Sequence, residues 1–358
     1  MKLSYNRLGE EGAAIIASSL PCEDGSHHRL AVLDLGFNSI GDQGAGSIAV
    51  DCIAGNMNLQ SLYLSGNKIR SEGAMSIAGG ILRGSALTQL HLSANNIGPM
   101  GVKAIAGAIA EIEAKRSNAA VTGGQIDQRL RSVEELHIGY TLSKSEGFLS
   151  IPGMLVSNHT MKVLSIPGNH LGDGDIALLT QALTHNSSVP LEQLLLSDND
   201  ISCSGLENIM NAVWGSKTLK ALKVDRNRLK DRAAQLCAVG LTSVQMEILD
   251  VGFNKIGVVG IKALMKNVSE TSSLKRLSLS GISLDQTGAK ALAYGLAKNS
   301  SLEVLNLDSC LNGYAFQRHV VAGIISNPNP SLRVITGFDI CRKCPVPWKP
   351  LAYPLSLL

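Results

Sequence analysis

Two histidines are the side chains with the clearest potential for chemistry. His91 and His137 each lie between two apolar residues, in the sequences L-H-L at 90–92 and L-H-I at 136–138. If these stretches form neighbouring strands, the two imidazoles lie about 5 Å apart, a spacing that could hold a metal ion. The sequence offers no clear third ligand, and histidines on an exposed strand face commonly serve as contact surface. We therefore predict no metal site.

A second possible metal site is the pair Cys341-x-x-Cys344 near the end of the chain. Zinc ribbons need a second cysteine pair at a set distance, and the sequence lacks one. A disordered tail that carries two thiols is the favoured interpretation. The chain has 7 cysteines, an odd number, so no disulfide framework is predicted.

Nucleotide and catalytic motifs are absent or better explained otherwise. Residues 44–49, GAGSIA, satisfy the dinucleotide pattern G-x-G-x-x-A, but no acid stands at 62–69, where a ribose ligand is needed. No glycine precedes Gly215 at P-loop spacing. The sequence contains no H-E-x-x-H, nucleophile elbow or carboxylate pair at a recognisable site. We predict that the chain is not an enzyme and uses no cofactor.

One sequence frame recurs along nearly the whole chain. Residues 30–49 read LAVLDLGFNSIGDQGAGSIA, and residues 246–265 read MEILDVGFNKIGVVGIKALM. Both follow L-x-x-L-x-L-x-x-N-x-I/L, with Gly six residues after the Asn. Such self-similarity is the mark of a repeat architecture. The Asn position is held by Asn6, Asn38, Asn67, Asn95, Thr141, Asn169, Asn199, Asn227, Asn254, Ile282, Cys310 and, in a degraded copy, Ile340.

Each part of the frame has a structural role. The alternating L-x-L predicts a short strand with leucines facing inward, and the following Ala, Ile and Leu at spacings of three and four predict a helix with one buried face. The Asn amide can pair backbone groups of stacked loops, which must be satisfied when buried. A helix is about 10 Å wide and strands lie about 4.8 Å apart, so the stack must curve with its strands inside.

The frame resembles that of the leucine-rich repeat family, in its ribonuclease-inhibitor-like class. The resemblance covers residues 1 to about 340. It implies an α/β solenoid, or horseshoe, of about 11–12 repeats, with parallel strands on the concave face and helices on the convex face. Because a repeat array is stabilised by contacts between neighbours, residues 1–340 are predicted to form one domain.

Three irregular regions interrupt or end the repeats. About 18 extra residues at 111–132 include a charged helix extension and a Gly-Gly loop, interpreted equally as a partner-binding loop or a tolerated insertion. Residues 341–358 are Pro-rich, and Trp348 and Leu351 are favoured to fold back as a cap over the last repeat rather than to form a free ligand. The chain begins within a strand of its first copy, which favours a fragment of a longer protein.

The concave strand positions are the predicted binding surface. A solenoid of this kind presents an extended concave face to protein partners. The expected face is mixed and mildly polar, which suits a protein contact with a few anchors. The predicted partner-binding residues are Asp34, Tyr63, His91, His137, Lys223, Asp225, Asp250 and Asn306.

Composition narrows the partner class and the setting. The net charge of +3 is small, and basic residues are scattered without aromatic interleaving, so no nucleic-acid partner is predicted. The sequence has no signal peptide and no membrane span, which predicts a cytoplasmic monomer. Four glycosylation sequons, at Asn158, Asn186, Asn267 and Asn299, are interpreted as left-handed helix ends.

The predicted function is a non-catalytic scaffold or recognition module that binds a protein. Within the family that the repeats resemble, a Ran-type GTPase-activating regulator and the sensor fragment of a nucleotide-binding receptor are the alternatives. The Ran-type regulators carry a strongly acidic tail, whereas this chain ends CRKCPVPWKPLAYPLSLL.

Overall fold

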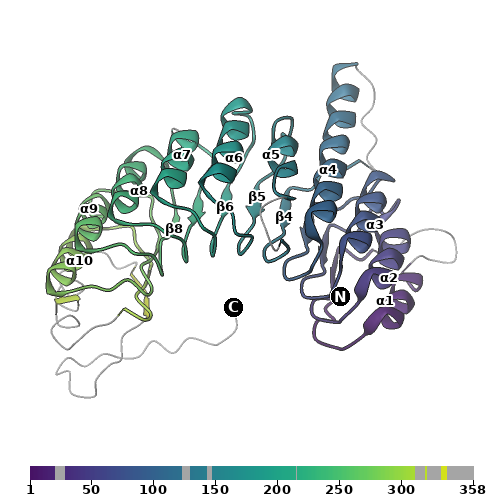
Figure 1. Cartoon of the computed structure of the whole chain (residues 1–358), viewed down its shortest axis with the longest axis horizontal. Helices are drawn as coiled ribbons and strands as arrows, with labels where there is room; N and C mark the ends of the chain where they lie inside the picture. The colour runs from purple at the N-terminus through teal and green to yellow at the C-terminus, as the bar shows by residue number, and fades with distance from the viewer. Residues whose placement is uncertain are drawn as a thin grey trace.

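The computed structural model describes residues 1–20, 29–122, 130–142, 147–214, 216–310, 319–320 and 332–336. Its strands form one parallel sheet of eleven strands, in which every strand pairs with the next along the chain. Figure 1 shows an open arc with the strands on the inner side and the helices on the outer side. The predicted α/β leucine-rich repeat solenoid is confirmed.

Strands and helices alternate through the described part of the chain. The strands are β1 (Val32–Asp34), β2 (Ser61–Tyr63), β3 (Gln89–His91), β4 (Glu135–His137), β5 (Val163–Ser165), β6 (Gln193–Leu195), β7 (Ala221–Lys223), β8 (Ile248–Asp250), β9 (Arg276–Ser278), β10 (Val304–Asn306) and β11 (Val334–Thr336). The helices are α1 (Gly9–Ser18), α2 (Gly41–Ser47), the π-helix η1 (Ile48–Ile53), α3 (Ser71–Leu82), α4 (Gly98–Val121), α5 (Ser150–Leu155), α6 (Asp173–His185), α7 (Cys203–Val213), α8 (Asp231–Ser243), α9 (Val258–Val268) and α10 (Gln286–Lys298).

The core lies between the sheet and the helices and runs through all the repeats. Leu62 of β2 and Leu64 just after it are fully buried, whereas Tyr63 between them is half-buried on the concave side. From α3, Ala74 and Ile77 complete the same layer. Each repeat therefore buries one leucine face of a strand against one helix face, as the period-two and period-3.6 patterns require.

A ladder of buried asparagines joins the repeats at the strand ends. The backbone N–H of Asn38 donates to Oδ1 of Asn67 at 2.7 Å, and the N–H of Asn67 donates to Oδ1 of Asn95 at 2.8 Å. Each amide nitrogen donates in turn to backbone carbonyls; Nδ2 of Asn67 reaches the oxygens of Leu35 and Leu64, both at 2.9 Å. The side chains thus satisfy backbone groups that the turn would otherwise leave unpaired in the interior.

Thr141 interrupts this ladder. Its hydroxyl donates to the carbonyl of Ile138 at 2.8 Å and its N–H donates to Oδ1 of Asn169 at 2.9 Å, which preserves the rung to the following repeat. No hydrogen bond joins the N–H of Asn95 to the Thr141 side chain among the bonds of these described residues. Threonine is too short to present an acceptor to the preceding repeat while also donating to its own strand.

Thr141→Asn is expected to stabilise the chain. The longer amide can keep the bond to Ile138 and offer its oxygen to the N–H of Asn95, a net gain of about 1 kcal/mol for one added buried hydrogen bond. Urea unfolding of the two proteins measures the difference. An unchanged or lower free energy of unfolding would show that the stack at this repeat cannot accommodate the amide.

Exposed aromatic rings lie over glycines at the next step of the solenoid. The rings belong to three residues with positive φ, each of which immediately precedes a residue at the ladder position. A Cβ added to the facing glycine would lie 2.1–2.4 Å from a ring carbon, so the glycine is required for the close approach. The pairs are Phe37 over Gly66, Tyr140 over Gly168 and Phe253 over Gly281.

The first part of the insertion is helical. Helix α4 has 24 residues and extends beyond its neighbours in Figure 1. Its Glu113 is buried and accepts a hydrogen bond from the hydroxyl of Thr160 at 2.6 Å, while Arg116 donates to the carbonyl of Leu130 at 2.7 Å. These contacts anchor the extension to the following repeat. The predicted Gly-Gly loop lies outside the described residues.

The helix-end asparagines do not adopt the left-handed conformation expected from the sequence. Asn186 and Asn299 are the C-cap residues of α6 and α10, with φ of −110° and −70°. Their side chains instead bridge repeats; Nδ2 of Asn186 donates to the carbonyls of Leu155 and Asn158, at 2.9 and 2.7 Å. The interpretation as left-handed caps was wrong, because the backbone φ is negative and the buried amide of Asn186 pairs carbonyls of the preceding repeat.

Most of the C-terminal residues for which the sequence makes predictions lie outside the described residues. Cys341, Cys344 and the proposed cap at 341–358 lie outside the described residues. None of the helices in the described ranges combines the length and apolar character that a bilayer span requires.

Candidate partner-binding surface

One side chain from each strand forms a continuous row along the concave face. The last residues of consecutive strands are paired in register: Asp34 opposes Tyr63, Tyr63 opposes His91, and His91 opposes His137. The same register continues to β11. The concave row comprises Asp34, Tyr63, His91, His137, Ser165, Leu195, Lys223, Asp250, Ser278, Asn306 and Thr336.

Two acidic residues of the concave row are held by their own strands. Oδ1 of Asp34 accepts the N–H of Gly36, and Oδ1 of Asp250 accepts the N–H of Gly252, both at 3.0 Å. Burial raises the pKa of Asp250, and the nearby Asp225 adds to the rise. These carboxylates have fixed orientations, so a partner would meet pre-positioned acceptors.

The other predicted contacts differ in how free they are. Asp225, in the adjacent column, accepts a hydrogen bond from Ser197, and Oδ1 of Asn306 accepts from the hydroxyl of Thr336 at 2.8 Å. Within the described ranges, no hydrogen bond or ion pair of the Lys223 ammonium is found. Lys223 opposes Asp250 across the strand pair, and its charge acts on that carboxylate. Its ammonium can also pair with a partner's carboxylate.

Three rings of the concave row stack on one another. The centroids of Tyr63 and His91 are 4.1 Å apart, and those of His91 and His137 are 4.0 Å apart with an angle of 12° between the planes. Burial lowers the pKa of His91 to about 3, with His137 contributing, and lowers the pKa of His137 to about 4. Both imidazoles are consequently neutral near pH 7.

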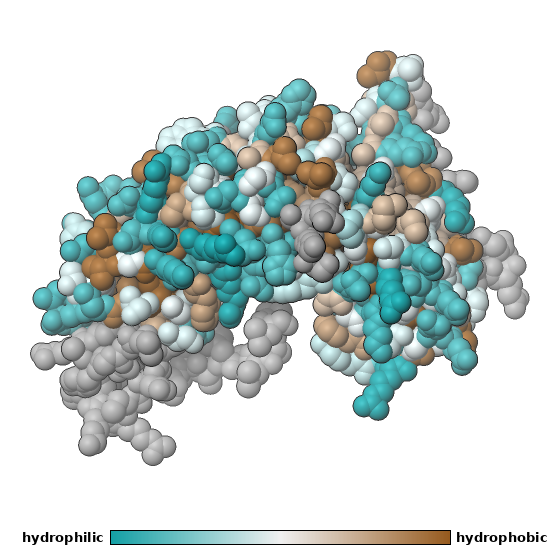
Figure 2. Space-filling view, in the orientation of Figure 1, coloured by the Kyte–Doolittle hydropathy of each residue, from teal (hydrophilic) through white to brown (hydrophobic). Residues whose placement is uncertain are grey.

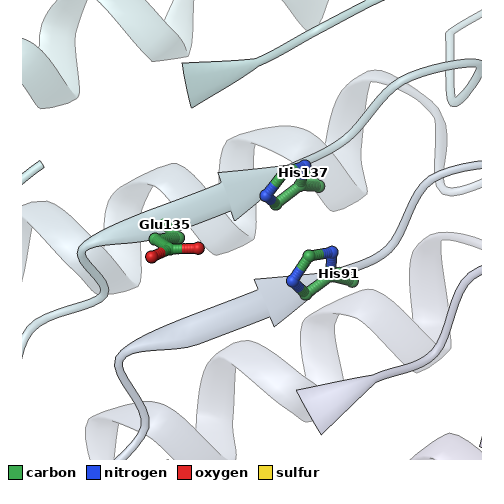
Figure 3. Close-up of side chains that lie close together, drawn as sticks. All are labelled: His91, Glu135 and His137. Atoms are coloured by element: carbon green, nitrogen blue, oxygen red, sulfur yellow. The ribbon is translucent and has the colours of Figure 1, made fainter. Parts of the chain in front are cut away.

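Glu135 completes a cluster with these histidines, which the sequence did not reveal. One ligand atom from each of His91, Glu135 and His137 lies within 4.8 Å of the others. Figure 3 shows the two rings side by side on adjacent strands, with Glu135 on the same side of β4 as His137. The expectation that the histidines have no third candidate ligand is wrong. The sequence signal for Glu135 as a third ligand is the E-x-H spacing of Glu135 and His137, because residues two apart on a strand share a face.

The free energy of unfolding is expected to fall as the pH drops from about 6.5 towards 4. The unfolded imidazoles bind protons below their ordinary pKa of 6.5, whereas the folded ones resist protonation until about 4 or lower. Stability from this source is complete above pH 6.5 and is lost as the pH falls. Urea unfolding at pH 7 and 5 measures it; a variant with both His91→Gln and His137→Gln should lose less than the wild type. An equal loss in both proteins would assign the acid sensitivity to other groups.

A second row of side chains, alternating in charge, runs along the N-terminal ends of the strands. The residues immediately before β4 to β9 are alternately acidic and basic. Lys162 bonds Glu134 at 2.7 Å, and two further pairs repeat this contact. Exposed pairs of this type stabilise a protein by roughly 0–1 kcal/mol each, so their contribution to the stability of the fold is small. Over β4 to β9 the row is Glu134, Lys162, Glu192, Lys220, Glu247 and Lys275, and Glu303 before β10 and Arg333 before β11 continue the alternation.

The face of the molecule seen in Figure 2 is mixed in character. Figure 2 shows hydrophilic and hydrophobic residues interspersed over the face in view. A shallow hollow of about 600 Å³ lies beside the strand ends, where Lys68 and Arg70 face the loop that contains Tyr140.

Comparison with known proteins identifies the repeat. The model of the Leucine Rich repeat family matches residues 28–49, 55–78, 86–106 and 245–265. The ribonuclease inhibitor of pig (Sus scrofa) is 24% identical over 313 residues, which cover 87% of this chain and 64% of the inhibitor. These matches support a leucine-rich repeat protein of the ribonuclease-inhibitor-like class.

Other proteins match parts of the chain or its fold. The mouse (Mus musculus) NACHT, LRR and PYD domains-containing protein 4C is 26% identical over 188 residues, which are 52% of this chain and 19% of that protein. In the crystal structure of the yeast Rad7 and Elc1 complex, one chain matches with a TM-score of 0.54 at 14% identity, covering 94% of this chain and 80% of the other. The chain thus spans less than two thirds of the length of both curated relatives.

Proposed function

We propose that the chain is a non-catalytic recognition module that binds a protein partner on its concave face. The observation that carries the proposal is the concave row, in which eleven strands present one side chain each in continuous register. Solenoids use such extended concave surfaces for binding. The fixed acceptors of Asp34 and Asp250, the cation of Lys223 opposite Asp250, and the stacked rings from Tyr63 supply polar, charged and flat apolar contacts.

A role as part of a receptor is the second candidate. The relative whose name includes NACHT, LRR and PYD domains is matched over only 19% of its length, so an equivalent array can stand beside other domains. We propose that residues 1–340 act as one solenoid unit, with 341–358 as its cap or tail. We further propose that it acts in the cytoplasm as a monomer, with no nucleic-acid or membrane partner; the small net charge of +3 supports the absence of a phosphate-binding surface.

Matched charge reversals on the two faces test the concave-face proposal. Lys223→Glu changes the concave row, whereas Lys262→Glu makes the same change on an exposed position of α9 on the convex side. Proteins captured from cell extract by the wild type are compared with those captured by each variant, using quantitative mass spectrometry. We expect at least one wild-type partner to be lost with Lys223→Glu and retained with Lys262→Glu.

Tyr63→Ala provides a second concave variant with no change of charge. The same partner should bind it less tightly in a purified assay, because truncating a central aromatic contact weakens association by about 1 kcal/mol or more. A partner that binds both concave variants as the wild type does, and is lost with Lys262→Glu, would place recognition on the helices and contradict the proposal.

A further inference from the structure

We propose that His91, Glu135 and His137 form a divalent-metal site on the concave face, suited to Zn²⁺. Two imidazoles and one carboxylate are the protein ligands of many zinc centres that keep a fourth position open. The three residues come from two adjacent strands, β3 and β4, and one ligand atom of each lies within 4.8 Å of the others. This inference does not depend on the concave face binding a protein.

The strand pairing fixes this geometry. His91 and His137 are directly opposed across the parallel pair, which places their rings 4.0 Å apart. Glu135 precedes His137 by two residues and so projects from the same face. Figure 3 shows one nitrogen of each ring and the Glu135 carboxylate facing a common space. A rigid sheet therefore holds the three ligands before any ion binds.

Two of the three ligand groups, those of His91 and Glu135, are not engaged by other side chains within the described residues. Nε2 of His91 is buried and has no hydrogen-bond partner, a costly state for a polar ring nitrogen. The carboxylate of Glu135 takes part in no ion pair within the described ranges, whereas its neighbour Glu134 bonds Lys162. A metal ion would satisfy the orphaned nitrogen and neutralise the carboxylate together.

Binding requires only a local adjustment. Zinc lies about 2.0–2.2 Å from nitrogen and oxygen ligands, so two atoms on one ion are at most about 4.4 Å apart. The nearly parallel rings must tilt so that their lone pairs converge, and the broad χ2 torsion of histidine allows this turn. The ion's fourth position would face the concave space, where water or a partner's side chain can occupy it.

Metal titration of the full chain tests the site. Cys341→Ser and Cys344→Ser are introduced first, so that the C-x-x-C pair cannot supply thiolate ligands. Zn²⁺ binding is measured by isothermal titration calorimetry, and Co²⁺ is used as a spectroscopic probe. We expect one ion per chain and a cobalt spectrum without the intense charge-transfer absorption that thiolate ligands produce.

Single substitutions decide which residues hold the ion. His91→Gln, His137→Gln and Glu135→Gln should each weaken Zn²⁺ binding at least about tenfold, since loss of one ligand removes a direct bond to the ion. The control His170→Gln alters an exposed histidine beside Asp200 and should leave binding unchanged. Glu135→Gln is nearly isosteric and half-exposed, so it reports on ligation without unfolding the sheet; circular dichroism checks this.

Two results would overturn the site. The first is a wild-type chain that binds no Zn²⁺ at micromolar concentration. The second is binding that all three substitutions leave within twofold of the wild type, which would place the ion on other residues.

Discussion

Leu62→Asp is expected to unfold the second, third and fourth repeats, or the whole array. Leu62 is fully buried between the sheet and α3. Its replacement loses about 2 kcal/mol of apolar burial and places a carboxylate in the core without a partner, so the total cost is roughly 4 kcal/mol or more. A solenoid is stabilised by neighbour contacts, so the damage should spread outward from β2.

Hydrogen exchange distinguishes local from global unfolding. Faster exchange in α2 and α3 with unchanged exchange in α9 and α10 would indicate local loss, and faster exchange throughout would indicate one cooperative unit. The control is Tyr63→Ser on the same strand, which removes one stacking contact on the concave side and should cost about 1 kcal/mol. A melting temperature of Leu62→Asp equal to that of the wild type would mean that β2 does not face the core as the structure shows.

The repeat frame explains why so much of the fold follows from the sequence. A fixed spacing forces equivalent residues into equivalent places, so the sequence alone predicts that His91 and His137 face each other in spite of the insertion between them. Substitutions at the ladder position are also consistent with the frame. Cys310 keeps one bond, from its thiol to the carbonyl of Leu279 at 3.2 Å, and Ile282 is simply buried.

Features that depend on two columns at once were not predictable by reading one column at a time. Glu135 stands at the first position of its strand and the histidines at the third, so a single column of the repeat does not contain all three. The alternating charge row was missed for a related reason, because Lys162 and Glu134 gain meaning only when neighbouring copies are aligned. Side-chain direction and cross-strand distance, not residue type, decide both cases.

Local backbone conformation was the least predictable level. The asparagines at the helix ends were expected to be left-handed, yet Asn186 adopts negative φ and uses its amide to bridge two repeats. Asparagine suits both roles, and the sequence does not distinguish them. The π-helix η1 also has no sequence signal, since its residues continue the apolar pattern of α2.

Asn67→Ala is expected to be among the most destabilising polar substitutions in the chain. Oδ1 of Asn67 accepts the N–H of Asn38 at 2.7 Å, and Nδ2 donates to the carbonyls of Leu35 and Leu64. The residue is fully buried, so water cannot replace these bonds. The substitution leaves the buried N–H of Asn38 unpaired and removes one of the two asparagine bonds to each carbonyl, since Nδ2 of Asn38 and Nδ2 of Asn95 still donate to Leu35 and Leu64. The total cost should be roughly 2–4 kcal/mol.

Asn96, the exposed residue next to the ladder residue Asn95, supplies the matched control for Asn67→Ala. Asn96 lies one residue after the ladder position and is exposed, and its N–H bonds the carbonyl of Ile69 through the backbone alone. Asn96→Ala should therefore change the free energy of unfolding by less than about 0.5 kcal/mol. Asn67→Thr should fall between the two, because a hydroxyl can donate to its own strand as Thr141 does.

Urea unfolding of the three variants gives the order, and exchange of the Asn38 amide gives the cause. That amide should exchange faster in Asn67→Ala, since its acceptor has been removed. If Asn67→Ala and Asn96→Ala were equally stable, the ladder would add nothing beyond what the leucine core provides. The repeats would then be joined by apolar packing alone, and the interruption at Thr141 would carry no energetic cost.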